Sequence, residues 1–456
     1  MMRLQLAQRI LGWGLCSLTL LVVQAEGKLR LATFSVDATP PIGTPLTYDE
    51  MTWLDQPLSC RGVVLLGDEL PIVLCAVDWI GIANEGQDAF KEAFAEAAGT
   101  IPERVAVHTL HQHDAPICDL TANRILAEHG YNGILADPVF IRKTIARAAE
   151  AIQVAVENPI EVTHIGASKA AVEKVASNRR IIGDDGKVAY TRYTTCRDPK
   201  IRAMPVGIVD ADVRVVGFWN EDTPIAVLSY FATHPQSYYR TGGANPDFPG
   251  IARTLRETET GGVFHLHFNG AGGDIGAGKW NDGNKENRLL LALRLARGMK
   301  TAFADMERQP ISADELAWKS VKVKLPVGPH LNAAALQNEI AADDTVELAR
   351  KEAARNLAWL QTASQGEGTS FSVLKMGGIQ LLHCPGEMLV EYQLAAQKMR
   401  PDRFVCLAAY GDYGPGYVCL ERHYSEGGYE ASQRASRVAP TVQSVLLPTL
   451  ESLLSD

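Results

Sequence analysis

The length, composition and charge of the chain exclude several classes of protein. The 456 residues are 46% hydrophobic and 21% charged, which is typical of a globular protein and excludes disordered, collagen-like and coiled-coil chains. The formal net charge is −9 and no run of five or six basic residues occurs, so we expect no nucleic-acid partner. At roughly 150 residues per domain, the length alone would suggest about three domains.

Residues 1–25 have the features of an export signal. Arg3 and Arg9 provide a positive start, residues 10–23 are apolar, and Ala25 offers a small residue at the cleavage position. The apolar stretch is shorter than the ~20 residues needed to span a bilayer, so a retained anchor is not favoured. We therefore expect a cleavable signal peptide and a secreted or periplasmic protein.

Strand and helix patterns alternate along the rest of the chain. Apolar or alternating runs predict strands at residues 29–36, 61–66, 71–78, 105–110, 161–176, 206–219, 225–233, 263–268, 318–325, 379–383 and 403–409. Amphipathic or capped segments predict helices at 87–98, from Asp137-Pro138 onward, at 286–306, at 346–363, after Pro385, and at the C-terminus. Because no convincing domain boundary stands out, we expect a single domain over residues 26–456, of α/β class, with helices layered on mixed β-sheets.

Histidines follow two of the predicted strands. In His111-Gln-His113, alternate residues of an extended segment would project to one face, so the two imidazoles are predicted to point the same way. His234 ends the strand at 225–233, where α/β sheets commonly place ligands, and Pro235 stops the strand. Imidazole is the commonest transition-metal ligand. The alternatives are surface histidines in a polar loop for the pair, and a core histidine for His234.

A carboxylate and a glycine-rich loop offer further candidates. Glu387 is predicted in the first turn of a helix opened by Pro385-Gly386, where it is either a metal ligand or a charge that stabilises the helix dipole. In the glycine-rich segment 268–278, backbone amides could bind an anion, and Asp274 either orients a ligand or caps a turn. Four tyrosines near the C-terminus suggest a site wall with phenolic donors: Tyr413, Tyr417, Tyr424 and Tyr429.

Together these motifs resemble the catalytic domain of the neutral/alkaline (non-lysosomal) ceramidases, a family of zinc-dependent amidases. The family motif HTHSGP corresponds to residues 111–116, its histidine-proline pair to His234-Pro235, and its Pro-Gly-Glu to residues 385–387. The family's spaced tyrosines correspond to Tyr417, Tyr424 and Tyr429, and its Asn-Arg pair to Asn178-Arg179.

The resemblance implies a neutral-ceramidase-like fold, one zinc ion per chain and a set of site residues. The implied zinc ligands are His111, His234, Glu387 and Tyr417. The predicted catalytic residues are His113, Arg179, Tyr429 and Asp274. The predicted substrate-binding residues are Gly273, Gly276 and Tyr424.

The sequence departs from the family pattern in three places. In the segment that corresponds to HTHSGP, Asp114-Ala115 stand where the family has Ser-Gly. The family's glycine-rich loop carries a serine that is important for amide cleavage, and Gly276 stands at that position. The resemblance ends near Asp456, so we expect no counterpart of the family's C-terminal immunoglobulin-like domain. Cleavage is therefore expected to depend on zinc-activated water alone.

These observations predict an exported zinc-dependent hydrolase, an amidase that cleaves an N-acyl, ceramide-like amide. One alternative is a zinc hydrolase of the same superfamily that acts on an ester, a phosphoester or a sugar amide. Another is a non-catalytic metal-binding protein. We expect a small-molecule or lipid substrate and no obligate protein partner, and peripheral membrane contact stays open because no amphipathic helix with a basic face stands out. A deep apolar slot above the site would favour a lipid, and a polar cleft a water-soluble substrate.

Overall fold

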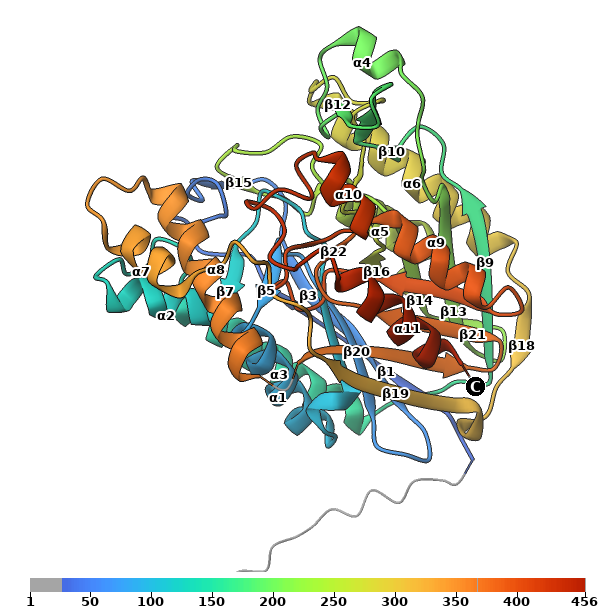
Figure 1. The fold of residues 1–456 in the computed structure, drawn as a ribbon. Helices are drawn as coiled ribbons and strands as arrows, with labels where there is room; N and C mark the ends of the chain where they lie inside the picture. The colour runs from blue at the N-terminus through green and yellow to red at the C-terminus, as the bar shows by residue number, and fades with distance from the viewer. Residues whose placement is uncertain (1–26, 367, 456) are drawn as a thin grey trace, which may run out of the picture.

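Three β-sheets form the centre of the fold in the computed structural model, which describes residues 27–366 and 368–455 (Figure 1). The first sheet has the order β6 (Val105–Thr109), β4 (Ile72–Val77), β3 (Ser59–Leu66), β1 (Arg30–Asp37), β8 (Ile160–Glu161). The second has the order β16 (Phe264–Asn269), β14 (Thr223–Phe231), β13 (Asp212–Asn220), β9 (His164–Ala171), β18 (Arg308–Pro310). The third has the order β19 (Leu316–Val323), β20 (Thr369–Met376), β21 (Ile379–His383), β23 (Phe404–Ala408). The predicted signal peptide at residues 1–25 lies outside the described residues.

Helices cover the outer faces of these sheets. The first sheet packs against α1 (Glu85–Ala98) and α3 (Pro138–Glu157), the second against α5 (Asp247–Glu259) and α6 (Glu286–Ala304), and the third against α9 (Val390–Met399) and α11 (Val442–Leu454). At the left of Figure 1, α2 (Leu120–Glu128) and α7 (Ala333–Ala341) contact α8 (Glu347–Gln365). Two short helices complete the set: α4 (Pro199–Ala203) and α10 (Glu421–Glu426). The predicted class, α/β with helices layered on mixed sheets, is confirmed.

Short strands pair in five two-stranded sheets. These are β5 (Gly81–Ala83) with β7 (Ile117–Asp119), β15 (Gly243–Ala244) with β2 (Trp53–Leu54), β10 (Ser177–Asn178) with β17 (Ile275–Gly276), β11 (Arg180–Ile182) with β12 (Val188–Thr191), and β22 (Glu387–Met388) with β24 (Tyr417–Val418). Each main sheet is mixed, because β4–β6, β14–β16 and β21–β23 are parallel pairs next to antiparallel ones.

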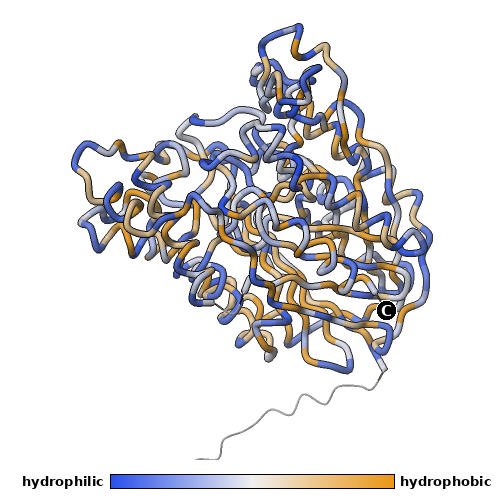
Figure 2. The backbone as a smooth tube through the Cα atoms, in the orientation of Figure 1, coloured by the Kyte–Doolittle hydropathy of each residue, from blue (hydrophilic) through white to orange (hydrophobic). Residues whose placement is uncertain are grey.

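The alternation of side chains explains why the first sheet is buried on both faces. In β3, Val64 and Leu66 belong to the core under α1 and α3, whereas Val63 and Leu65 belong to a core shared with the second and third sheets. Each fully buried aliphatic side chain stabilises the fold by about 1.5–3 kcal/mol. In Figure 2 hydrophobic residues concentrate on the central strands, and hydrophilic residues on the peripheral loops.

Local sequence signals predicted one helix start correctly and another wrongly. Asp137 caps α3, because its Oδ1 accepts hydrogen bonds from the amides of Val139 (2.9 Å) and Phe140 (3.1 Å), as the Asp-Pro pair predicts. The prediction that Glu387 lies in the first turn of a helix is wrong. Glu387 lies in β22, paired with β24, and α9 begins only at Val390. A pairing partner 30 residues away along the chain therefore overrides the local helix signal.

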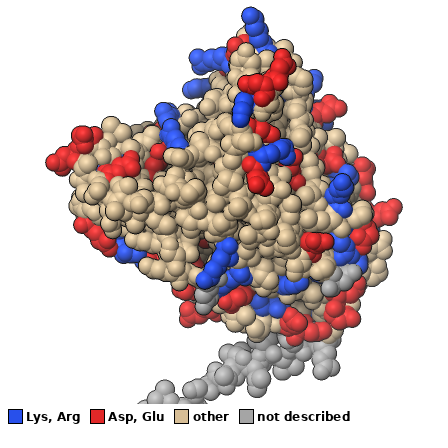
Figure 3. All heavy atoms as spheres, in the orientation of Figure 1, with Lys and Arg blue, Asp and Glu red and all other residues tan. Residues whose placement is uncertain are grey.

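The surface gives two further observations. Among the described residues, no helix combines the length and apolarity that crossing a bilayer requires. In Figure 3 acidic and basic side chains are interspersed over the face that is drawn, and on the described part of that face they form no extended patch of one sign.

Candidate metal centre

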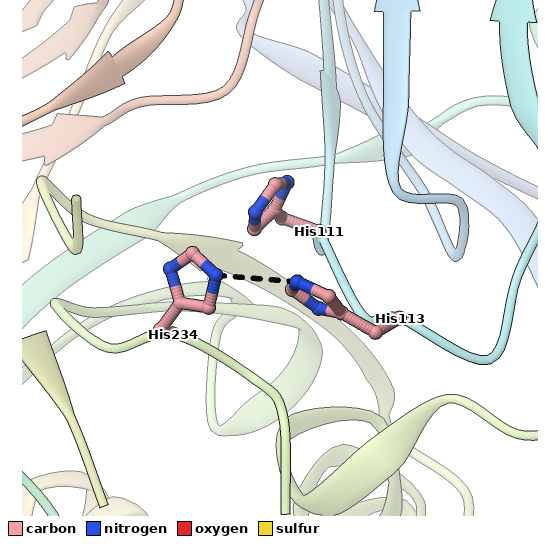
Figure 4. Close-up of side chains that lie close together, drawn as sticks. All are labelled: His111, His113 and His234. Atoms are coloured by element: carbon pink, nitrogen blue, oxygen red, sulfur yellow. Dashed lines mark hydrogen bonds between the residues drawn. The ribbon is translucent and has the colours of Figure 1, made fainter. Parts of the chain in front are cut away.

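Three buried histidines converge beyond the carboxyl ends of the central strands (Figure 4). His111 and His113 follow β6, His234 follows β14, and their exposed fractions are 1%, 5% and 2%. One ring nitrogen of each lies within 4.8 Å of the other two. The ring centroids are 5.0 Å apart for His111 and His113, 4.6 Å for His111 and His234, and 4.9 Å for His113 and His234. This clustering of imidazole nitrogens is what a transition-metal site requires.

A turn, rather than an extended strand, directs His111 into the cluster. Its φ is +63°, in the left-handed region, so the side-chain alternation predicted for His111 and His113 is not the reason that they converge. The Nδ1 atom of His111 lies 2.7 Å from the carbonyl oxygen of Ile80. Because a carbonyl only accepts hydrogen bonds, Nδ1 of His111 carries a proton, which leaves only Nε2 to bind a metal ion. Nε2 is therefore the ligand atom that His111 offers.

The carboxylate of Glu387 completes the cluster from β22. Its Oε2 lies 3.1 Å from Nε2 of His111 and 3.8 Å from Nδ1 of His234. Two ligand atoms around a tetrahedral zinc ion with bonds of 2.0–2.1 Å are about 3.3 Å apart, so these separations fit a shared cation. The other oxygen, Oε1, accepts a hydrogen bond of 2.7 Å from the Tyr413 hydroxyl, which fixes the direction of Oε2.

The electrostatics of the cluster also favour a cation. Burial, followed by the neighbouring charges, lowers the pKa of both His113 and His234 well below the ordinary histidine value. Burial alone would raise the pKa of Glu387, but its interactions with His111, Tyr413 and Arg179 bring the pKa below its ordinary value. Neutral imidazoles thus face an ionised carboxylate. Within the described chain, Nδ1 of His113, Nδ1 of His234 and Oε2 of Glu387 make no hydrogen bond, so their lone pairs fit a metal ion.

Two tyrosines and an arginine border the cluster on one side. Tyr417 pairs with Glu387 in the β22–β24 bridge, and its ring stacks on His234 at a centroid distance of 6.4 Å. The Tyr417 hydroxyl accepts a hydrogen bond of 3.1 Å from Nη2 of Arg179, and Arg179 also pairs with Glu430 at 3.0 Å. Burial disfavours the charge of Arg179, but its interactions with Tyr417 and Glu430 hold its pKa well above the ordinary value. The Tyr429 ring stands edge-on to Tyr417, at 5.6 Å between centroids.

Comparison with solved structures identifies the fold. No protein-family model matches the sequence, and no curated protein sequence matches it. The structure of the neutral ceramidase from Pseudomonas aeruginosa matches with a TM-score of 0.67 and 15% sequence identity, over 93% of this chain and 74% of that one. The chain has a neutral ceramidase-like fold. A structure of a ceramidase complexed with C2 gives a TM-score of 0.64 at 15% identity, again over 93% of this chain and 74% of that one.

The neutral ceramidase-like fold confirms the resemblance at the level of architecture. At 15% identity the likeness concerns the fold, and the role of each site residue stays a prediction. The structure brings eight of the predicted residues to the walls of one cavity of about 350 Å³: His111, His113, Arg179, His234, Glu387, Tyr413, Tyr417 and Tyr429.

The glycine-rich loop of the neutral ceramidase-like fold lies behind this cavity. The carboxylate of Asp274 is buried and accepts hydrogen bonds from Asn178 Nδ2 (2.7 Å) and the Val390 amide (2.9 Å), so it ties the loop to β10 and α9. A Cβ atom on Gly273 would lie 2.7 Å from the carbonyl oxygen of Glu387. The loop therefore supports the backbone of β22 at close range, and only glycine fits at position 273.

Two other predicted residues are not among the cavity walls. At Gly276, where the resemblance implies a serine, a Cβ atom would lie 2.8 Å from the methyl carbon of Thr194, so that methyl group fills the space of a side chain. The Tyr424 hydroxyl lies 2.9 Å from Oγ of Ser436 and donates to the carbonyl oxygen of Val438 at 3.2 Å. The Tyr424 side chain therefore binds α10 to Ser436 and Val438 and does not line the cavity.

Sequence reasoning missed a group of polar residues in the cavity walls. The missed residues are Tyr48, Gln236, Tyr239, Arg240, Lys351, Glu352, Arg355, Arg434 and Arg437. Tyr48 stacks on His113 with centroids 5.6 Å apart and an interplanar angle of 3°. One signal was available: Lys351, Glu352 and Arg355 share a face of the helix predicted at 346–363, at the three- and four-residue spacings.

Proposed function

We propose that the protein is an exported, single-domain, zinc-dependent hydrolase of the neutral ceramidase type, and that it cleaves an N-acyl amide. The observation that carries the proposal is the convergence of three buried histidines and the Glu387 carboxylate at a cavity. The neutral ceramidase-like fold supports it, and the export signal rests on residues 1–25. We further propose that residues 26–456 form one domain, since residues of all the distant segments meet at the site.

In this proposal one zinc ion per chain is held by His111, His234, Glu387 and Tyr417. Bound zinc supplies Lewis acidity and a water nucleophile at neutral pH. The chain supplies the orientation of the ligands: the Ile80 carbonyl fixes the tautomer of His111, and the Tyr413 hydroxyl fixes the direction of the Glu387 carboxylate.

The residues around the ligands perform the proton transfers and stabilise charge. His113 is neutral and its Nδ1 has no partner in the described chain, so it accepts the proton of the attacking water. The water oxygen adds to the acyl carbon, the C–N bond breaks, and the amine leaves with a proton returned by His113. Arg179 and Tyr429 stabilise the tetrahedral oxyanion, and a well-placed donor typically contributes about 3–4 kcal/mol. Asp274, Gly273 and Gly276 hold the loop that supports Glu387.

Metal analysis and turnover test the proposal together. We expect about one zinc per purified chain, and loss of the metal from His234→Ala and Glu387→Gln, while His330→Ala, outside the cavity, retains it. Hydrolysis of fluorogenic N-acyl amides should require zinc and disappear in Glu387→Gln. A folded wild-type protein that takes up no zinc would contradict the metal site.

A second candidate is hydrolysis of an ester or phosphoester at the same site. It is favoured by the absence of a side-chain hydroxyl at Gly276, the position where the resemblance implies a serine used for amide cleavage. Matched amide, ester and phosphate substrates with one fluorogenic leaving group would rank the activities. Bound zinc without turnover of any of them would indicate the non-catalytic metal-binding protein instead.

A further inference from the structure

Helix α8 forms one wall of the cavity beside the candidate metal centre. Leu348, Lys351, Glu352 and Arg355 lie on one helix face and line this cavity. In total the walls carry six basic side chains and only two carboxylates, Glu352 and Glu387. The basic residues are Arg179, Arg240, Lys351, Arg355, Arg434 and Arg437.

Half of these basic side chains already have a carboxylate partner. Arg179 pairs with Glu430 at 3.0 Å, Lys351 with Glu347 at 2.6 Å, and Arg434 with Glu352 at 3.0 Å. Within the described chain, Arg240, Arg355 and Arg437 have no carboxylate within the 4.0 Å that defines an ion pair. Arg240 is exposed and lies over the rings of Tyr48 and Tyr239. The excess positive charge inside the cavity therefore belongs to Arg355 and Arg437.

Arg437 is buried and Arg355 is half-buried, and within the described chain neither forms an ion pair with a carboxylate. Arg437 is 5% exposed; its Nε donates to Asn356 (2.6 Å) and its Nη1 to the Gly414 carbonyl (3.2 Å). Its Nη2 makes no hydrogen bond in the described chain. The guanidinium carbon of Arg355 lies 5.0 Å from the centre of the Tyr413 ring, and its buried Nε has no hydrogen-bond partner there either. Burial and the charge of Arg355 lower the pKa of Arg437 only to about 10, so it stays charged at neutral pH.

Buried charges without partners are costly, and an oxyanion would satisfy them. Arginine donors match the geometry of carboxylate and phosphate oxygens. Arg355 lies close to the proposed reaction centre. It covers the ring of Tyr413, and the hydroxyl of that ring binds Glu387. Aliphatic surface is scarce in the cavity, where the larger aliphatic side chains are Ile117, Leu135 and Leu348.

We propose that Arg355 and Arg437 form a subsite for an oxyanion group of the substrate, a carboxylate or a phosphate, a short distance from the acyl bond that is cleaved. The substrates are then short, negatively charged N-acyl amides rather than neutral lipids with two long chains. The identity of the cleaved bond rests on the proposed function; the anion subsite does not.

Two matched pairs of amides test the preference with the as-purified full chain. N-hexanoylglycine is compared with N-hexanoylglycinamide, and N-hexanoyl-phosphoethanolamine with N-hexanoylethanolamine, by release of hexanoate. We expect kcat/KM to be about 10- to 100-fold higher for the charged member of at least one pair, and that pair identifies carboxylate or phosphate. Arg355→Gln should abolish the preference, measured as the ratio of kcat/KM within each pair, and Arg355→Lys should restore part of it. Arg294→Gln, an equal loss of charge on α6 outside the cavity, should change nothing.

Binding of unreactive anions separates this inference from the proposed function. Calorimetric titration with succinate and with inorganic phosphate should show binding to the wild type and to Arg294→Gln that is weakened about 10-fold or more in Arg355→Gln. Anion binding that depends on Arg355, without turnover of any amide, would support the subsite and contradict the proposed function. Equal kcat/KM within both pairs, or a preference and an anion affinity that survive Arg355→Gln in a protein with an unchanged Tm, would overturn the subsite.

Discussion

At the scale of single residues, the Tyr413 hydroxyl controls how Glu387 presents its carboxylate. The hydroxyl binds Oε1, and this leaves Oε2 for the space between His111 and His234. Groups that orient a metal ligand commonly change the affinity for the metal 10- to 100-fold when they are removed. We expect Tyr413→Phe to weaken zinc binding by about this factor while the ring keeps its packing. Competition with a zinc chelator would measure the change.

The neighbouring Tyr410 provides a matched control for that prediction. Its ring stacks on His111 at 4.5 Å between centroids, but its buried hydroxyl has no hydrogen-bond partner in the described part of the chain. Tyr410→Phe therefore removes the same atom without removing a bond to a ligand, and we expect zinc affinity to stay within about twofold. If both variants bound zinc equally weakly, the polarity of the rings, and not the hydrogen bond to Glu387, would determine the zinc affinity.

Another residue-scale prediction concerns Gly276 and Thr194. Because a Cβ atom at position 276 would lie 2.8 Å from the Thr194 methyl carbon, Gly276→Ser should lower the free energy of unfolding by about 1–3 kcal/mol. Thr194→Ser removes that methyl group and keeps the hydroxyl that donates to Gln236 at 2.8 Å. The double variant should therefore recover most of the loss in urea unfolding. Additive losses in the double variant would exclude this contact as the cause.

At the scale of elements, the β22–β24 bridge joins two candidate ligands. Gly386 precedes it with a φ of +65°, and a Cβ atom there would lie 2.7 Å from the carbonyl oxygen of Gly416. Gly386→Ala should therefore lower the free energy of unfolding by about 1–3 kcal/mol and also weaken zinc binding, because it displaces Glu387 from Tyr417. Gly378→Ala is the control, since nothing lies within 4 Å of its Cβ position and its φ is not positive. Urea unfolding and zinc titration of both variants would check this.

The same bridge shows where prediction from the sequence succeeds and where it does not. The strands and helices with a strong local pattern, such as β21 and α3, could be predicted because their periodicity and capping residues are local. The conformation of Glu387 could not, because it depends on pairing with Tyr417 across a loop. His111 was identified as a candidate ligand, but the left-handed turn that directs it leaves no signal in a non-glycine residue. Arg437 gave no signal either, since only the fold brings it next to α8.

At the scale of the whole molecule, the packing of three sheets assembles the site. β6, β14 and β21 each end just before a candidate ligand segment, and side chains of all three sheets share one hydrophobic core. The length of the chain alone would suggest three independent domains, yet His111, His234 and Glu387 follow strands of three different sheets. We therefore expect the three sheets to unfold cooperatively. A substitution that destabilises one sheet should also weaken metal binding by the ligands that follow the other two.

Buried histidines outside the site make the stability of the whole molecule depend on pH. Burial lowers the pKa of His108 to about 4, and burial with nearby arginines lowers the pKa of His265 and of His267 to about 3. Since the unfolded chain binds protons with a pKa near 6.5, each of these histidines contributes stability that is present above pH 6.5 and is lost as the pH falls. Asp114 and Asp412 act in the opposite direction between pH 6.5 and 5.5, because burial raises their pKa to about 6.

The contribution of one histidine can be isolated by comparing wild type with His267→Gln. Integrating the linkage relation from pH 6.5 to 5.5 gives a loss of about 1 kcal/mol for a histidine that stays neutral when folded. The free energy of urea unfolding should therefore fall by about 1 kcal/mol less in His267→Gln than in the wild type over this interval, whatever the variant does to stability at pH 6.5. The two carboxyl groups are common to both proteins, so their opposing effect cancels in the difference. Parallel pH profiles would mean that His267 has the same pKa in the folded and the unfolded chain, and its buried position on β16 would then need a counter-ion.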